Sequence, residues 1–180
     1  MSYSIGVRPM GGADAEKYLH LRQQMVTCEP TAFNVDPGTI PTIKEVAIEF
    51  ADSRPDPDMI RYMATVQWGS GQRVAGMIGA RAMTPPWDAE AFVGAVGAFY
   101  VPNYLRGHNV GRTLLRVALN FLDEKVDEVS LDVSSDNPRA YDFYKRLGFE
   151  ETGLWYPWWN GSDIQDIVMI APVALALKNL

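Results

Sequence analysis

The chain has 180 residues, of which 47% are hydrophobic and 21% charged, as in an ordinary soluble globular domain. No apolar run approaches the roughly 18 residues that span a bilayer, and no secretion signal precedes Pro9, so a cytoplasmic protein without a membrane partner is expected. The formal charge of −6 argues against general nucleic-acid binding. The single cysteine, Cys28, fits a reducing compartment and is expected to be a small buried side chain.

The first half of the chain predicts one strand, two helices and two further strands. Tyr3, Ile5 and Val7 alternate with polar or small residues, and a helical spacing of apolar residues follows over 14–26. A capping box at Thr42 and Glu45 opens a second helix. Alternating residues over 60–68 and an apolar, glycine-rich run over 73–83 then predict a hairpin about the turn at 69–71.

The second half of the chain predicts four more strands and two helices. The strands are expected over 91–101, 129–133, 150–159 and 164–172, and the helices over 111–126 and 138–147. Asn137 is the predicted cap of the last helix and Gly148 its left-handed terminator. Because no repeat or linker-like stretch interrupts this order, we expect a single mixed α/β domain over 1–180 with about seven strands.

A basic, glycine-containing segment joins a predicted strand to a predicted helix. It reads Arg106-Gly107-His108-Asn109-Val110-Gly111-Arg112 and lies in a stretch without acidic residues. Such a turn leaves backbone N–H groups unpaired at the positive end of the helix dipole, where a phosphate or diphosphate can bind. The alternative is a plain connector with solvated arginines. The spacing matches neither the dinucleotide fingerprint nor the phosphate loop that ends in Gly-Lys-Ser/Thr.

A second motif follows one helix and one strand later. In the run from Asn137 to Phe149, the residues Asn137, Ala140, Tyr144, Gly148 and Phe149 have the spacing Asn-x-x-Ala-x-x-x-Tyr-x-x-x-Gly-Phe. With Arg106 and Gly111 in the first motif, the chain resembles the GNAT superfamily of acyl-CoA-dependent N-acetyltransferases. The resemblance implies a GNAT fold, with a central sheet splayed between its fourth and fifth strands, and acetyl-CoA as co-substrate.

The resemblance also implies residue roles. Tyr100 and Val101 would bind the pantetheine arm through their backbone, and Asn137 through its side chain. The diphosphate would be bound by the basic turn, that is by Arg106, Gly107, His108, Asn109, Val110, Gly111 and Arg112. Asn109 stands where the family usually has the middle glycine, and asparagine tolerates the positive φ that such a turn requires.

Tyr144 would protonate the departing thiolate. A thiol has a pKa of about 8.5 and tyrosine about 10, so a phenol can give its proton to a developing thiolate and recover it afterwards. The amide of Val101 is a candidate oxyanion donor. The alternative for Tyr144 is a core aromatic residue on the same helix face as Ala140 and Leu147.

The acceptor side is less defined. Aromatic residues gather in Trp155-Tyr156-Pro157-Trp158-Trp159, and they would form a wall for an apolar or cationic amine, a dimer contact or part of the core. The candidate acceptor residues are Phe33, Trp87, Glu90, Trp155, Trp158 and Trp159. No general base is assigned, because Glu45, Asp88, Glu90 and Asp166 each also fit an ordinary surface charge. The two histidines and one cysteine are scattered, so no metal site is predicted.

The leading hypothesis is an N-acetyltransferase in which a primary amine attacks acetyl-CoA directly in a ternary complex. A non-catalytic acyl-CoA-binding module of the same fold is one alternative. Another is an enzyme whose acceptor is a protein N-terminus or lysine rather than a small molecule. The acceptor, the acyl preference and homodimer formation are left open.

Overall fold

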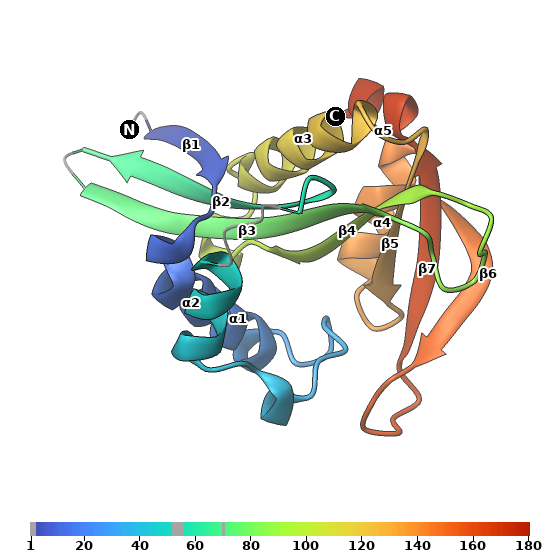
Figure 1. Ribbon diagram of the computed structural model, residues 1–180, viewed down its shortest axis with the longest axis horizontal. Coiled ribbons are helices and arrows are strands. Elements are labelled where there is room, and N and C mark those ends of the chain that lie inside the picture. Colours follow the sequence, from blue (N-terminus) through green and yellow to red (C-terminus); the bar gives the residue numbers. More distant parts are fainter. Residues whose placement is uncertain (1–2, 52–55, 70) are drawn as a thin grey trace.

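The computed structural model describes residues 3–51, 56–69 and 71–180. Within these ranges the chain forms one seven-stranded sheet in the order β1-β2-β3-β4-β5-β7-β6 (Figure 1). The strands are β1 (Tyr3–Pro9), β2 (Met59–Trp68), β3 (Gly71–Met83), β4 (Val93–Tyr100), β5 (Glu128–Ser134), β6 (Glu150–Pro157) and β7 (Gln165–Pro172). Neighbouring strands are antiparallel except for the central pair of β4 and β5, which is parallel.

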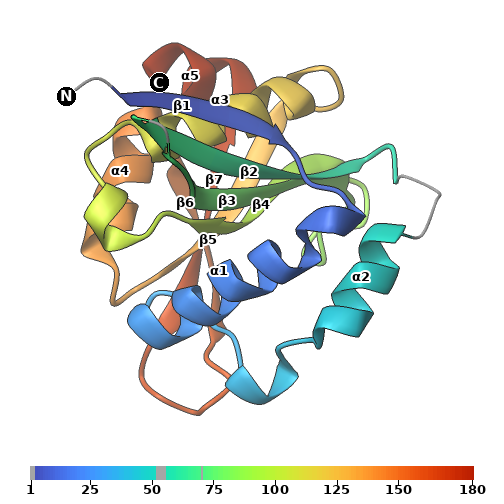
Figure 2. The same cartoon turned by 90° about the vertical axis from the view of Figure 1, so that its left-hand side faces the viewer.

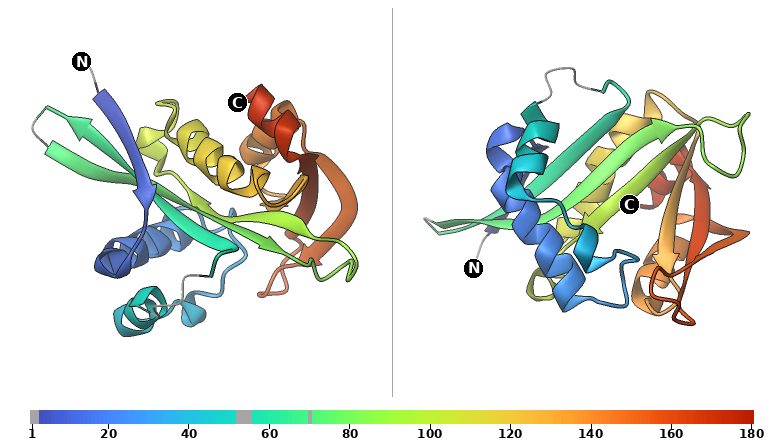
Figure 3. Two further views of the ribbon diagram at one scale, coloured as in Figure 1. Left: turned by 45° about the horizontal axis from the view of Figure 1, so that its top comes forward. Right: turned by 60° about the horizontal axis from the view of Figure 1, so that its bottom comes forward.

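Helices cover both faces of the sheet. The α-helices are α1 (Ala15–Cys28), α2 (Ile43–Ala51), α3 (Val110–Asp123), α4 (Pro138–Leu147) and α5 (Val173–Asn179), with short 3-10 turns η1 (Gly12–Asp14), η2 (Pro37–Thr39) and η3 (Asn103–Leu105). Figures 1 and 2 show α1 and α2 below the sheet and α3 and α5 above it. Figure 3 shows the same layers from two further sides. The expectation of a mixed α/β fold is confirmed.

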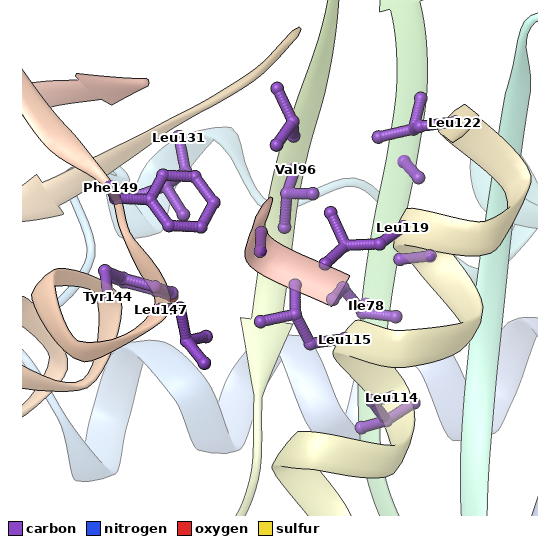
Figure 4. Close-up of a cluster of buried hydrophobic side chains, with 14 of the residues drawn as sticks. Ile78, Val96, Leu114, Leu115, Leu119, Leu122, Leu131, Tyr144, Leu147 and Phe149 are labelled. Carbon is purple, nitrogen blue, oxygen red and sulfur yellow. The ribbon is translucent and has the colours of Figure 1, made fainter. Parts of the chain in front are cut away.

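The main core lies between the sheet and the α3, α4 and α5 layer. Leu114, Leu115, Leu119 and Leu122 of α3 are fully buried, because their spacing places them on one side of the helix. Figure 4 shows Val96 of β4 between these leucines and a second group drawn from β5, α4 and the connection from α4 to β6. The second group includes Leu131, Tyr144, Leu147 and Phe149. One core therefore joins both halves of the sheet.

A β-bulge turns the end of β4 away from β5. Gly97 pairs with Gly79, but Tyr100 pairs with Met77, so β4 has one residue more than β3 over this interval. Ala98, inside the bulge, has a φ of +47°, which is rare for a residue with a side chain. On the other side, β4 pairs with β5 only over 94–96. Beyond Val96 the two central strands diverge, and the expected splay is confirmed.

The predicted helix caps are confirmed, and one predicted helix end differs from the structure. The capping box is present: the Thr42 amide donates to the Glu45 carboxylate at 2.7 Å, and the Glu45 amide donates to the Thr42 hydroxyl at 3.3 Å. Asn137 caps α4, and Gly148 ends it in the left-handed region with a φ of +95°. The third helix ends at Asp123, three residues before the predicted end.

Two features differ from expectation. The predicted order has no helix after the last strand, whereas α5 follows β7 directly; Pro172 precedes it without a side-chain cap, so the usual start signal is missing. Cys28 is exposed and not buried, because it is the last residue of α1 and lies on the solvent side of that helix. Among the helices of the described ranges, none is long and apolar enough to cross a membrane.

Candidate functional site

A cavity of about 300 Å³ opens where β4 and β5 diverge. We call it the donor cavity. The end of β4, the loop before α3, the first turn of α3, and α4 form its walls, and Ala32 and Phe33 close one side. The lining residues are Ala32, Phe33, Phe99, Tyr100, Val101, Leu105, Arg106, Gly107, Asn109, Val110, Gly111, Arg112, Asn137, Arg139, Ala140, Phe143, Tyr144 and Arg146.

Free backbone amides face this cavity at the start of α3. The first hydrogen bond of the helix runs from the Thr113 amide to the Asn109 carbonyl at 3.0 Å. The amides from Gly107 to Arg112 make no hydrogen bond to another described residue. Gly107 and Asn109 have φ values of +83° and +62°, so this turn uses the left-handed conformation twice. A turn of this kind, at the positive end of a helix, is suited to bind an anion.

The donor cavity is positively charged in an acidic protein. Four arginines line it, and among the residues that the structure describes no aspartate or glutamate does. Arg106 is held in place, since its guanidinium donates to the Val101 carbonyl at 3.1 Å and to the Glu29 carboxylate at 2.6 Å. Arg112 donates to the Leu180 backbone oxygen at 3.0 Å. Arg139 and Arg146 form no ion pair with any described residue.

Tyr144 reaches the donor cavity from α4. Only 8% of this residue is exposed, and its ring packs edge-on against Phe149 at a centroid distance of 5.7 Å. Burial raises the pKa of its hydroxyl well above the ordinary value. The phenol is therefore neutral at physiological pH and can donate a proton or a hydrogen bond inside the cavity.

A second cavity, of about 240 Å³, lies beside the paired part of β4 and β5. We call it the acidic cavity. Pro85, Pro86 and Trp87 of the β3–β4 loop and Tyr156 of β6 form its walls together with both central strands. Asp132 is the one charged residue among those lining it. Desolvation in the cavity, and to a lesser extent the charge of Asp166, raises the pKa of the Asp132 carboxyl.

The two cavities follow each other along β4. Val93, Ala95 and Val96 line the acidic cavity, and Phe99 and Tyr100 line the donor cavity. Asp132 is the first residue of β5 after its last pairing with β4. Leu131 and Val133 point into the core beside Tyr144, so the side chain between them lies on the opposite face of the strand. A carboxylate and a phenol thus flank the point of divergence from opposite faces.

Most of the predicted donor residues come together. Tyr100, Val101, Arg106, Gly107, Asn109, Val110, Gly111, Arg112, Asn137 and Tyr144 all line the donor cavity. The Asn137 side-chain oxygen accepts from the Ala140 amide at 3.2 Å, which leaves its side-chain nitrogen as the group for a ligand. His108 does not line the cavity, and its side chain packs against Tyr3 and Trp68 instead.

The predicted acceptor residues are more scattered. Phe33 lines the donor cavity and Trp87 the acidic cavity, whereas Glu90, Trp155 and Trp159 are exposed and line neither. Trp158 is buried at 4% exposure and lines neither cavity, and its indole N–H donates to Asp166 at 3.1 Å. Of the other carboxylates considered, Glu45 is used in the capping box of α2, and Asp88 lies exposed in the β3–β4 loop.

Sequence reasoning missed Asp132. Its signal is the alternation of β5, because a strand that buries Val129, Leu131 and Val133 on one face presents Asp132 on the other. No group of three or more histidine, cysteine, aspartate or glutamate side chains able to hold a metal occurs in the part of the chain that the structure describes.

The family model of the acetyltransferase (GNAT) family matches residues 28–149, from the end of α1 to the start of β6. The chain belongs to the GNAT acetyltransferase family. The matched range contains the turn before α3, Asp132 and Tyr144.

Among similar proteins, the N-alpha-acetyltransferase RimI of Mycobacterium tuberculosis is 34% identical over 87 residues, which cover 47% of this chain and 51% of RimI. An uncharacterised protein of Mycobacterium leprae is 38% identical over 77 residues, covering 41% of this chain and 20% of that protein. The chain thus matches about half of RimI and about a fifth of the other relative.

Solved structures share the GNAT fold over nearly the whole chain. A GNAT-family acetyltransferase of Streptococcus pneumoniae superposes with a TM-score of 0.73 at 17% identity, covering 94% of this chain and 99% of that one. Arabidopsis thaliana NAA60, solved in complex with acetyl-CoA, superposes with a TM-score of 0.69 at 15% identity, covering 95% and 99%.

Proposed function

We propose that this GNAT protein transfers an acetyl group from acetyl-CoA to a primary amine by direct attack in a ternary complex. The observation that carries the proposal is the donor cavity, where free amides and four arginines, with no acidic side chain, lie beside a buried, neutral Tyr144. Such a cavity suits a polyanionic donor. The acidic cavity beside it suits a cationic acceptor.

Acetyl-CoA would supply the activated acetyl thioester. The residues present fit it: the amides from Gly107 to Arg112 and the guanidinium groups of Arg139 and Arg146 would bind its phosphates. Tyr100 and Val101 offer backbone groups at the diverging end of β4. On the β5 side these groups are not paired, because β4 pairs with β5 only over 94–96. Asn137 offers its side-chain amide to the pantetheine arm.

Tyr144 would act as general acid. Because its hydroxyl stays neutral in the buried cavity, it holds a proton to give to a departing thiolate. The Val101 amide would stabilise the oxyanion that forms as the amine attacks.

Asp132 would act as general base for the acceptor. An amine arrives mostly as an ammonium ion, which must lose a proton before it can attack. The raised pKa of Asp132 lies closer to physiological pH than the pKa of an ordinary aspartate. Its carboxylate is therefore a better proton acceptor. Asp166, ordered by Trp158, would attract the same cation.

Three classes of acceptor remain under this proposal. The similarity to RimI, which is named an N-alpha-acetyltransferase, favours a protein N-terminus. The aromatic residues Trp87 and Tyr156 in the acidic cavity favour a small cationic amine held by cation–π contact. A peptide lysine is a third acceptor to include.

The test is release of free thiol from acetyl-CoA in the presence of amine and peptide panels. Tyr144→Phe is expected to reduce turnover about 10- to 1000-fold while the Kd for CoA changes little. Tyr141→Phe is a matched control, since this half-buried tyrosine on the same helix does not line the donor cavity and its hydroxyl donates to Glu151. CoA binding without turnover on any acceptor would support the non-catalytic module, and unchanged turnover in Tyr144→Phe would remove its acid role.

A further inference from the structure

An aromatic cluster connects the turn before α3 to the edge strand β1. The β1–β2 register pairs Tyr3 with Trp68, and their rings meet at a centroid distance of 6.3 Å. The His108 ring packs edge-on against both, at 5.4 Å from Tyr3 and 6.5 Å from Trp68. The Tyr3 hydroxyl also donates a hydrogen bond to the His108 carbonyl oxygen at 3.1 Å. Figure 2 shows the yellow-green segment before α3 on the same side as the start of β1.

The Tyr3 hydrogen bond determines where a neighbouring amide points. In a trans peptide, the carbonyl of one residue and the N–H of the next point in opposite directions. The His108 carbonyl points toward β1, so the Asn109 N–H points away from β1. Asn109 lines the donor cavity, which lies on that other side of the turn, whereas His108 does not line it. The bond therefore keeps the Asn109 amide available to an anion in the cavity.

Backbone strain works against this orientation. Asn109 has a φ of +62°, which costs energy for any residue with a side chain, although least for asparagine and aspartate. Rotation of the peptide plane between His108 and Asn109 by about 180° would bring this φ into the ordinary negative range. The same rotation would turn the Asn109 N–H away from the cavity, and the Asn109 side chain makes no cap hydrogen bond that would oppose it.

We infer that Tyr3 is a positioning residue for the diphosphate of the donor. Its hydroxyl holds the His108–Asn109 peptide in the strained orientation that presents an amide to the phosphate, and the rings of His108 and Trp68 hold the hydroxyl in place. Neither of the two sequence motifs contains Tyr3, which lies more than 100 residues before the turn. The inference rests on the proposed function, since it concerns binding of CoA.

The test compares binding of CoA, which carries the diphosphate, with binding of pantetheine, which lacks it. Tyr3→Phe keeps the ring contacts and removes only the hydroxyl. We expect the Kd for CoA to rise about 5- to 30-fold and the Kd for pantetheine to stay within twofold, because a charge-assisted hydrogen bond to phosphate is lost. The kcat at saturating acetyl-CoA is expected to stay unchanged while its KM rises. Tyr104→Phe, which removes an exposed hydroxyl from the same loop, is the control.

A second variant separates positioning from general damage. Asn109→Gly removes the strain at the turn, because glycine adopts positive φ without cost. In this background Tyr3→Phe is expected to weaken CoA binding less than threefold. An equal loss for CoA and pantetheine, or an unchanged Kd for CoA in Tyr3→Phe, would overturn the inference while leaving the proposed function intact. Failure of the wild-type protein to bind CoA would overturn both.

Discussion

Desolvation raises the pKa of both titratable side chains at the point where β4 and β5 diverge, although Tyr144 is buried and Asp132 is an exposed residue that lines the acidic cavity. For Tyr144 the upward shift keeps the phenol protonated, as a general acid must be, but also makes it a weaker acid. For Asp132 the upward shift increases the basicity of a group that must take a proton. The same physical cause, desolvation of the charged form, thus raises the basicity of Asp132 and lowers the acidity of Tyr144.

The first prediction concerns Asp132. Only its ionised form can accept a proton, so kcat/KM is expected to fall as the pH drops through a raised carboxyl pKa, above the ordinary value of about 3.9. Asp132→Asn is expected to lose about 100-fold or more in kcat/KM at pH 7 and to lack this acidic limb. The pH–rate profiles of the two proteins are the measurement. An acidic limb that persists in Asp132→Asn would assign the base elsewhere.

The second prediction concerns the buried Asp14, which lies outside the site. Arg8 donates to both of its carboxylate oxygens, at 2.6 and 2.7 Å, and the Gly11 amide donates at 3.0 Å. The Arg8 hydrogen bonds are the main reason that the pKa of Asp14 falls to about 2. A lowered pKa stabilises the fold above the ordinary carboxyl pKa, and this stability is lost as the pH falls from about 4 to 2.

Asp14→Asn tests this ion pair. Because half of the Arg8 side chain is exposed, we expect a loss of only about 1–2 kcal/mol in the free energy of unfolding at pH 6. The difference between wild type and variant is expected to shrink toward zero near pH 2. Urea titrations at several pH values measure it, and a difference that does not depend on pH would contradict the assignment.

At the scale of elements, the bulge in β4 depends on a close approach by β3. A Cβ atom at Gly76 would lie 2.6 Å from the Tyr100 carbonyl oxygen and 3.1 Å from Leu114. Only glycine lets β3 lie this close to the end of β4, where the donor cavity begins. The shape of the cavity is therefore set partly by a residue that does not line it.

The third prediction is that Gly76→Ala destabilises the fold by about 1–3 kcal/mol, because the Tyr100 backbone must move to make room. The displaced end of β4 is also expected to raise the Kd for CoA. Gly97→Ala is the control for stability, since its Cβ would meet no atom within 4 Å. Urea unfolding of both variants gives the comparison, and equal stability of the two would show that β3 and β4 can separate without cost.

At the scale of the whole molecule, the central strands are paired over only three residues, yet one core spans both halves. Buried residues of β2 and β3 share it with those of β5, β7, α4 and α5. Phe149 is fully buried at the join between α4 and β6 and packs against Tyr144. The helices, more than the strand pairing, hold the two halves of the splayed sheet together.

The fourth prediction follows from this shared core. The chain is expected to unfold in one cooperative transition, the same by far-UV circular dichroism and by tryptophan fluorescence. Phe149→Ala is expected to cost about 3–5 kcal/mol and to shift both probes together. Two separate transitions, with only one moved by the variant, would instead divide the chain into two domains.

Much of the site was predictable because its chemistry lies in short, continuous segments. The unpaired amides of the turn follow from a helix that begins at Val110 without a side-chain cap, and Tyr144 follows from its spacing after Asn137. The order of strands and helices up to β7 also followed from local periodicity, and the splay between the fourth and fifth strands from the family resemblance. In these cases each feature depends on neighbours within about one helical turn or one strand.

Only the tertiary structure decided the remaining features, because they depend on residues far apart in the chain. The basicity of Asp132 comes from a cavity built by the β3–β4 loop and β6, and the orientation of the Asn109 amide depends on Tyr3. Trp158 differs from Trp155 and Trp159 in being buried against Asp166, a difference that no local pattern encodes. Desolvation and hydrogen-bond direction are set by what packs nearby in space, and the sequence order does not record that.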